Sequence, residues 1–360
     1  MTPKEDSSSC SKGKVLLTGG TGFVASHVLD CLLDHGFEVV VTVRSQEKGQ
    51  RITKSVDETL GKQVSFVVVE DIAKEGAFDE VVNSDPPFDY VVHTASPYRL
   101  HWEDPVKDCL DPAIKGTTGI LQSIHAYAPT VKRVVITSSS AAILRPPNHP
   151  KVYDESSWSD VTWEQAMDPK HTYRASKKFA EKSAWSFLTT HTPSFTLATI
   201  NNSYTFGPIP RSLASLGALN TSNHRIRDLV QGRMLRAGIP PTAPVFTYVD
   251  VRDVALAHVR ALTVPDAGGK RFYVVGGFFS NPRLVGIVRR RFPALEDRLP
   301  PKEEEEKDDF PEDYWGFDNS RSREVLGVEY RGLEESVVAT VESILRFEGG
   351  GEAGESDLPT

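Results

Sequence analysis

The sequence predicts an α/β protein with a doubly wound parallel sheet, and three observations support this fold class. Short apolar runs such as 15–17, 38–43 and 90–93 are typical of strands that are buried on both faces. Segments with helical spacing of apolar residues, such as 23–35 and 112–128, alternate with these runs. The first apolar run also leads into a glycine-rich turn that opens a helix.

The alternation of strands and helices continues for about the first two hundred residues. Further elements are predicted as strands at 64–69, 134–136 and 195–200 and as a helix at 171–191. Beyond Gly207 proline, glycine and arginine become frequent and the pattern loosens. There the predicted elements are helices at 228–237 and 254–262 and a strand at 271–275.

Composition excludes several functional classes. The 360 residues carry a net charge of −8, and a nucleic-acid-binding protein would need a basic face. Cys10, Cys31 and Cys109 are too far apart to indicate a disulfide framework or a metal site. The N-terminal residues lack the apolar stretch of a signal peptide, and no apolar run reaches the roughly 18 residues of a membrane span. We therefore expect a cytoplasmic protein with reduced thiols that binds neither metal, membrane nor nucleic acid.

The glycine turn between the first strand and the first helix predicts a phosphate-binding site. Gly19 would make the tight turn, Gly22 would let the backbone approach a pyrophosphate, and Ala25 would keep helix and strand close. The N-terminus of the helix then offers N–H groups to the phosphates. The residues expected to contact a dinucleotide in this Rossmann-type turn are Gly19, Thr21, Gly22, Phe23 and Val24.

The residues after the second strand indicate which dinucleotide binds. An NAD-binding protein usually has an acidic residue here, whereas this chain has Arg44, which suits a ribose 2′-phosphate, with Lys48 as a second cation. The sequence therefore predicts NADP(H) as the cofactor. Further contacts are expected after the third and fourth strands, from Asp71 and Ile72 to the adenine and from Thr94, Ala95 and Ser96 to the middle of the cofactor.

These signals suggest how the chain is divided. We expect an NADP-binding Rossmann domain at 13–205, to which segments near 245–280 return. A smaller C-terminal substrate-binding region follows at 206–347. The ends at 1–12 and 348–360 have the composition of disordered tails.

Three residues form the predicted catalytic group. Tyr173 and Lys177 are four residues apart in a predicted helix, which places them on one face. A nearby ammonium favours the phenolate and lowers the pKa of a tyrosine, which can then exchange a proton with a carbonyl or alcohol at neutral pH. Ser139, at the end of the fifth strand, can hydrogen-bond the same substrate oxygen.

Together these residues resemble the extended short-chain dehydrogenase/reductases, and most closely the dihydroflavonol reductase group and the fungal aldehyde/ketone (methylglyoxal-type) reductases. The likeness spans about 14–347 and includes the stretches 43–48, 111–117, 153–158, 206–208, 248–255 and 317–320. It implies that Ser139 is a catalytic residue, that Tyr173 is the general acid in reduction, and that Lys177 binds the nicotinamide ribose and tunes Tyr173.

The chain departs from the family pattern at two places. Asn201-Asn202-Ser203 stands where the family usually has Asn-Pro-Gly, so the nicotinamide contacts expected from Asn202 and Ser203 carry less weight. Lys115 stands where relatives often have asparagine, which makes a proton relay through that side chain doubtful. Tyr98, Ser140, Tyr204 and Phe206 are the candidate substrate contacts, and aromatic walls of this kind suit a hydrophobic carbonyl compound.

The predicted function is the NADPH-dependent reduction of a ketone or aldehyde to an alcohol, for which a tailoring step in secondary metabolism is one setting. A nucleotide-sugar epimerase or dehydratase would share the fold and the Tyr/Lys pair, but such enzymes usually keep NAD bound, and Arg44 argues against this. A non-enzymatic NADP sensor is a third reading. The expected partner is a small carbonyl compound, and a monomer and a homodimer both remain open.

Overall fold

The computed structural model describes residues 11–56, 63–96 and 102–350. The chain divides into two compact units. The first takes in the described residues up to Thr137 together with Val161–Thr199 and His258–Lys270, and the second takes in Ser138–Asp160, Ile200–Ala257 and the described residues from Arg271 onward. No helix in the described part combines the length and apolarity of a membrane crossing.

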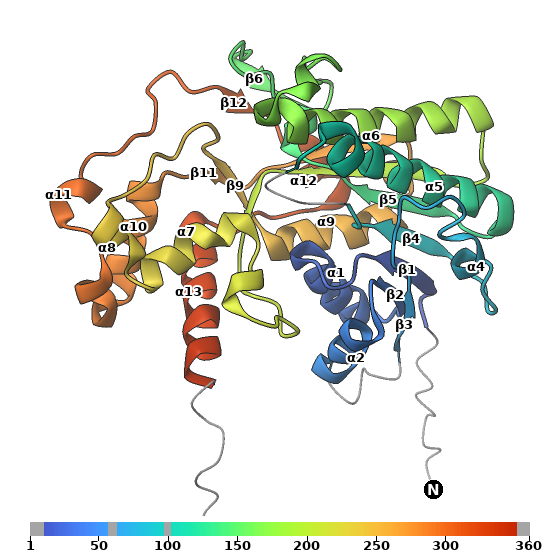
Figure 1. Cartoon of the computed structure of the whole chain (residues 1–360), viewed down its shortest axis with the longest axis horizontal. Helices are drawn as coiled ribbons and strands as arrows, with labels where there is room; N and C mark the ends of the chain where they lie inside the picture. The colour runs from blue at the N-terminus through green and yellow to red at the C-terminus, as the bar shows by residue number, and fades with distance from the viewer. Residues whose placement is uncertain (1–10, 57–62, 97–101, 351–360) are drawn as a thin grey trace, which may run out of the picture. The chain divides into compact units, whose positions relative to one another are not determined.

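A seven-stranded sheet organises the fold (Figure 1), and its strands lie in the order β10-β7-β5-β4-β1-β2-β3. The strands are β1 (Lys14–Thr18), β2 (Glu38–Val43), β3 (Val64–Val68), β4 (Tyr90–His93), β5 (Arg133–Thr137), β7 (Thr196–Asn202) and β10 (Lys270–Val274). β1 pairs in parallel with β2 and β4, and the pairs β2–β3 and β4–β5 are parallel too. The order reverses between β1 and β4, so the predicted doubly wound sheet is confirmed. A ligand of such a sheet binds at the carboxyl ends of the strands at this reversal.

Helices of the first unit cover this sheet. They are α1 (Phe23–Asp34), α2 (Gln46–Ser55), α4 (Asp79–Val82), α5 (Asp111–Tyr127), which a π-helical turn (Val106–Leu110) precedes, α6 (Pro169–His191) and the C-terminal part of α9 (Val251–Thr263). Figure 1 shows α5 and α6 running side by side, and the two helices are in contact.

The register of the strands explains the core beneath α5 and α6. Leu16, Val91 and Val134 are neighbours across β1, β4 and β5, and successive side chains of a strand point to opposite faces. All three belong to a cluster that also holds Ile120 and Ile124 of α5 and is fully or nearly fully buried. The burial of each such leucine, isoleucine or valine side chain stabilises the folded state by roughly 1.5–3 kcal/mol relative to an exposed side chain.

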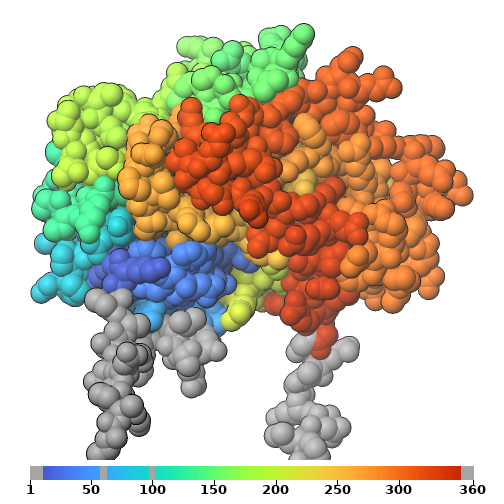
Figure 2. Space-filling view, turned by 180° about the vertical axis from the view of Figure 1, so that it is seen from behind, coloured from blue at the N-terminus to red at the C-terminus, as the bar shows by residue number. Residues whose placement is uncertain are grey.

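The second unit has smaller sheets. β11 (Gly277–Phe278), β9 (Thr247–Asp250) and β8 (Tyr204–Phe206) form one, and β12 (Gly316–Phe317) and β6 (Val152–Tyr153) form another. Its helices are α7 (Thr221–Val230), α8 (Arg233–Ala237), α10 (Asn281–Arg291), α11 (Lys302–Glu305), α12 (Ser320–Leu326) and α13 (Leu333–Gly350). In Figure 2 the segments from α10 to α13, coloured orange to red, form a continuous surface on this unit.

One predicted helix is wrong. The sequence predicts a single helix at 228–237, but α7 ends at Val230 and α8 begins at Arg233. Gly232 separates them with a left-handed φ of 68°, a conformation that interrupts a right-handed helix. The predicted strands at 38–43 and 90–93 are confirmed with the same bounds.

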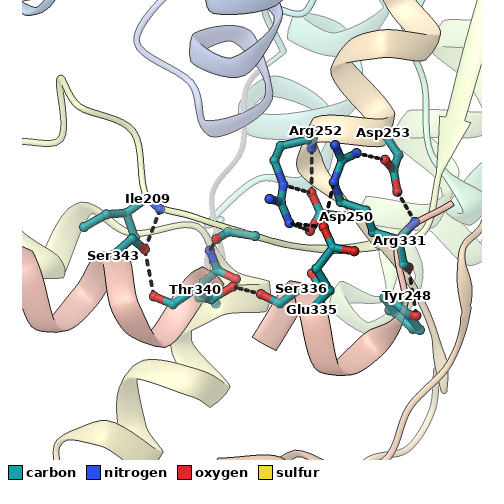
Figure 3. A network of polar contacts seen from close by, with 12 residues as sticks. Ile209, Tyr248, Asp250, Arg252, Asp253, Arg331, Glu335, Ser336, Thr340 and Ser343 are labelled. Atoms are coloured by element: carbon teal, nitrogen blue, oxygen red, sulfur yellow. Dashed lines mark hydrogen bonds and ion pairs between the residues drawn. The ribbon is translucent and has the colours of Figure 1, made fainter. Parts of the chain in front are cut away.

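A network of ion pairs around two buried aspartates joins α9 to the start of α13 in the second unit (Figure 3). Arg252 binds Asp250 through Nη2 at 2.8 Å, and Arg331 binds Asp253 through both its guanidinium and its backbone N–H. The Arg331 Nε atom lies 3.1 Å from Glu335. Burial raises the pKa of Asp253 to about 6, against the pull of Arg331. Both aspartates are fully buried, so their charges depend on these arginine partners.

Candidate active site

The glycine turn has the geometry of a phosphate cradle. Gly19 takes a left-handed φ of 73°, and a Cβ atom there would stand 2.9 Å from the Cα of Ala95. Gly22 precedes α1, donates its N–H to the Gly19 carbonyl at 2.8 Å, and offers no side chain to cap the helix. The first-turn N–H groups of α1 therefore lack a side-chain cap, and an anion can bind them. Thr21, Phe23 and Val24 are exposed or half-buried around this turn.

Arg44 and Lys48 follow β2 on the same unit. The Gly20 N–H donates to the Thr42 carbonyl at 3.0 Å, which ties the glycine turn to the end of β2. Arg44 is exposed and Lys48 is half-buried, and neither side chain forms an ion pair with another described residue. The nearby Glu47 is paired with Arg51 at 2.9 Å. Two uncompensated positive charges thus lie after β2, as a phosphate-binding site requires.

The ends of β1 and β4 are joined by hydrogen bonds. Thr94 donates its hydroxyl to the Thr18 carbonyl at 2.6 Å, and the Ala95 N–H donates to Thr18 Oγ1 at 3.1 Å. Thr18 Oγ1 also lies 2.9 Å from Nδ1 of His93, which is almost fully buried. The stretch Thr94–Ser96 is therefore held against the start of the glycine turn.

The predicted adenine contacts lie after β3. Asp71 is exposed, and its carboxylate accepts the Ala73 N–H at 2.9 Å. Ile72 is half-buried, and a Cβ atom on Gly116 of α5 would stand 2.8 Å from its Cδ1 atom. The glycine at 116 thus lets α5 approach the loop that carries both predicted contacts.

Tyr173 and Lys177 lie one turn apart on α6, as the spacing predicts. Asp168 caps this helix by accepting the Lys170 N–H at 3.0 Å, and Pro169 opens its first turn. Both side chains are half-buried, and Lys177 Nζ lies 5.8 Å from the centre of the Tyr173 ring. Lys177 donates to Ser96 Oγ at 3.0 Å.

The electrostatics of Lys177 suit a catalytic role. Burial lowers its pKa from the usual 10.5 to about 8. The amine is therefore mostly charged at neutral pH, yet it can exchange its proton within a physiological range. A pKa perturbed by burial in this way is typical of functional sites.

The second unit carries the other predicted catalytic residue. Ser139 follows the end of β5, and its Oγ atom accepts the Ala141 N–H at 3.1 Å. Ser140 begins a short 3-10 turn and is buried. Asn201, to which the sequence assigns no role, donates from Nδ2 to the Ser138 hydroxyl at 3.1 Å and to the Ser139 carbonyl at 3.3 Å. Asn201 thus fixes the backbone that carries Ser139.

The remaining predicted contacts of the second unit are engaged with their neighbours. Asn202 donates to Thr205 Oγ1 at 2.9 Å, and Ser203 Oγ donates to the Thr247 carbonyl at 2.8 Å. Tyr204 is half-buried. Tyr98 lies outside the described residues.

Phe206 is a core residue. It is fully buried, its ring centroid lies 4.9 Å from that of Phe279 in an edge-on contact, and it belongs to the main hydrophobic cluster of the second unit. We therefore leave Phe206 out of the substrate contacts that we propose.

A parallel sheet with a glycine cradle at its reversal and a Tyr/Lys pair on a neighbouring helix defines a nucleotide-dependent oxidoreductase of the short-chain dehydrogenase/reductase class. The profile of the NAD dependent epimerase/dehydratase family matches residues 15–276, and the chain belongs to this family.

Comparison with known proteins extends this result to more than nine-tenths of the chain. The chain is 57% identical to the ketoreductase azaE of Aspergillus niger over 92% of its own length and 97% of the relative. It is 36% identical to the NADPH-dependent methylglyoxal reductase GRE2 of Saccharomyces cerevisiae, over 93% of this chain and 99% of that protein. The structure also matches the crystal structure of Gre2 from Candida albicans in complex with NADPH, with a TM-score of 0.85 and a sequence identity of 36%. This match covers 92% of this chain and 98% of the Gre2 chain.

Proposed function

We propose that this protein is an NADP-dependent carbonyl reductase, which converts a ketone or aldehyde to an alcohol. One observation carries the proposal: the Lys177 ammonium lies one turn from Tyr173 and is bonded to Ser96 beside the glycine cradle. The ketoreductase and methylglyoxal reductase relatives support the same reaction.

The first unit fits the cofactor. A Cβ atom at Gly19 would stand 2.9 Å from the Cα of Ala95, so the tight turn requires glycine, and the first turn of α1 lacks a side-chain cap. Arg44 and Lys48 would hold the 2′-phosphate, because no described acidic side chain neutralises them. When bound, NADPH supplies the hydride that reduces the carbonyl carbon.

The chain's own residues supply the proton and the orientation. Tyr173 donates its phenolic proton to the carbonyl oxygen, which becomes the alcohol hydroxyl. Lys177 favours the phenolate that this transfer leaves, through its positive charge on the same face of α6. Ser139 stays a predicted catalytic residue and is tested by the variant Ser139→Ala.

We propose that the substrate is a hydrophobic carbonyl compound and that the reaction is a tailoring step in secondary metabolism. The 57% identity to a ketoreductase favours a ketone. A cytoplasmic location is part of the same proposal, supported by the unpaired thiols of Cys31 and Cys109. Whether the enzyme acts as a monomer or a homodimer is tested by light scattering.

The deciding experiment follows the absorbance of NADPH with aldehydes, diketones and aromatic polyketides as substrates. We expect net consumption of NADPH and a loss of about 10²-fold or more in kcat for Tyr173→Phe. Tyr127→Phe is the matched control, because Tyr127 is exposed at the end of α5. An epimerase would turn over its sugar nucleotide without consuming NADPH, and a sensor would bind NADPH without turnover. Full activity of Tyr173→Phe would refute the mechanism.

A further inference from the structure

His93, the last residue of β4, lies next to the cofactor cradle in an unusual setting. It is 2% exposed and is the register partner of Thr18, the last residue of β1. Its Nδ1 atom lies 2.9 Å from Thr18 Oγ1. Thr18 thus contacts both the buried imidazole and the segment Thr94–Ala95, at the point where the strand order of the sheet reverses.

The hydroxyl of Thr18 takes part in two hydrogen bonds, and one assignment of the protons lets it accept in one and donate in the other. The Ala95 N–H donates to Thr18 Oγ1 at 3.1 Å, so the hydroxyl acts as acceptor there. Its own proton can then be donated to His93 Nδ1, and we assign Nδ1 as the acceptor of this hydrogen bond. A histidine that accepts through Nδ1 carries its proton on Nε2, and the imidazole is neutral. Burial agrees with this, because it lowers the pKa of His93 to about 3, and the Lys177 ammonium of α6 adds to the effect.

A purely structural role explains this histidine poorly. Nε2 is buried and has no hydrogen-bond partner among the described residues, and its neighbour is the Phe78 ring in an edge-on contact. Burying a polar group without a partner costs stability, and an apolar side chain such as leucine would avoid that cost. What leucine could not do is accept the Thr18 proton.

We propose that His93 is a positioning residue for carbonyl reduction: as a neutral acceptor it orients the Thr18 hydroxyl, which holds Thr94–Ser96 against the glycine turn and so places Ser96 to bind Lys177. This inference rests on the proposed function.

Each link of this chain of contacts is short. The Ala95 backbone that Thr18 binds is also the backbone that lies 2.9 Å from the position of a Cβ at Gly19, so Ala95 is in close contact with the glycine turn. The next residue, Ser96, accepts from Lys177 Nζ at 3.0 Å. A displacement of Ala95 would therefore shift both the glycine turn at Gly19 and the Ser96 hydroxyl that binds the Lys177 amine.

The test compares three variants of the full chain. His93→Asn keeps an acceptor near the position of Nδ1, His93→Leu removes it, and Thr18→Val removes the hydroxyl. We expect His93→Leu and Thr18→Val each to weaken NADPH binding, measured by fluorescence titration, by about tenfold, and His93→Asn to stay within about twofold of wild type. The double variant should bind no worse than either single one, because the two side chains act as a unit.

A matched control separates this role from general loss of packing. Ser123→Ala breaks another hydrogen bond of the first unit, the partly buried one from the Ser123 hydroxyl to Asp79 at 2.6 Å, and should leave NADPH affinity unchanged. NADPH affinity is measured without a carbonyl substrate. The proposal for His93 can therefore fail while the proposed carbonyl reduction is correct, and the proposed carbonyl reduction can fail while the proposal for His93 is correct. Three results would overturn the proposal. The first is wild-type NADPH affinity in a folded His93→Leu variant, and the second is an equal loss of affinity in His93→Asn and His93→Leu. The third is a double variant whose loss of affinity is the sum of the two single losses. If His93→Leu does not fold, Thr18→Val and His93→Asn decide the same question.

The neutral state of His93 has its own test in the protein without cofactor. Between the unfolded-state pKa near 6.5 and the folded-state pKa of about 3, the unfolded chain holds one more proton at this residue. The folding equilibrium of the wild type should therefore fall by about tenfold for each pH unit below 6.5, relative to His93→Asn, in urea titrations. Parallel pH dependences of the two proteins would show that folding does not lower the pKa of His93, and would overturn its assignment as a neutral residue throughout this pH range.

Discussion

Replacing Gly19 by alanine perturbs the cofactor cradle at a single atom. The left-handed φ of 73° costs an alanine roughly 1–2 kcal/mol. The new Cβ would also stand 2.9 Å from Cα and 3.0 Å from N of Ala95, so backbone must move. Overpacking of this kind costs about 1–3 kcal/mol more. We expect Gly19→Ala to lose about 2–5 kcal/mol of unfolding free energy and to bind NADPH at least tenfold more weakly.

Gly36 provides a matched control at the opposite end of α1. Its φ is 79°, and a Cβ atom there would meet nothing within 4 Å. Gly36→Ala should therefore lose only the conformational part, roughly 1–2 kcal/mol, and keep its affinity for NADPH. Urea titration measures the free energies, and fluorescence titration measures binding. The reasoning is refuted if Gly19→Ala loses no more stability than Gly36→Ala and binds NADPH as tightly as the wild type.

Three further predictions test the charges of the two units. Arg44→Ala should raise KM for NADPH by about tenfold or more and leave KM for NADH nearly unchanged, whereas Arg51→Ala, which removes only the partner of Glu47, should change neither. The steady-state rate of carbonyl reduction should fall as pH rises through about 8, where Lys177 loses its proton. A rate that stays constant across that range would contradict a role for the charged Lys177 amine. Arg331→Ala should lower the free energy of unfolding by about 3 kcal/mol at neutral pH, because it leaves the buried carboxylate of Asp253 without its partner. This loss should become smaller as pH falls, because the unpaired carboxylate takes up a proton. Urea titrations that give the same loss at acidic pH would argue against the pairing.

The predictions held where local pattern and burial point the same way. β2 is a continuous apolar run because the strand is largely buried, and its bounds match the prediction. α2 has no such signal: Ile52 is its one buried apolar side chain, and its packing depends on Gly49, where a Cβ would stand 2.1 Å from the Phe66 ring. That contact joins two separate elements, and no periodicity within the helix reports it.

The boundaries of the compact units also depend on tertiary contacts. The sequence predicts a boundary near residue 205 and a return of segments near 245–280 to the first domain, whereas the structure assigns Ser138–Asp160 to the second unit and returns only His258–Lys270 to the first. Arg133 of β5 helps to hold the segment His258–Lys270 to the first unit, because its guanidinium donates to the carbonyls of Ala261 and Pro265. An arginine in an apolar run gives no indication of which distant carbonyls it will bind.

The sequence by itself determined the fold class, the glycine turn, the spacing of Tyr173 and Lys177, and the cations after β2, because each is a pattern within a few neighbouring residues. The tertiary structure alone decided that Lys177 binds Ser96, 81 residues away, and that His93 Nδ1 lies within hydrogen-bond distance of the Thr18 hydroxyl, 75 residues away. Both contacts follow from the pairing of β1 with β4 and the packing of α6 in the same unit. The residue types state what a side chain can bind, and only the folded chain decides which partner it meets.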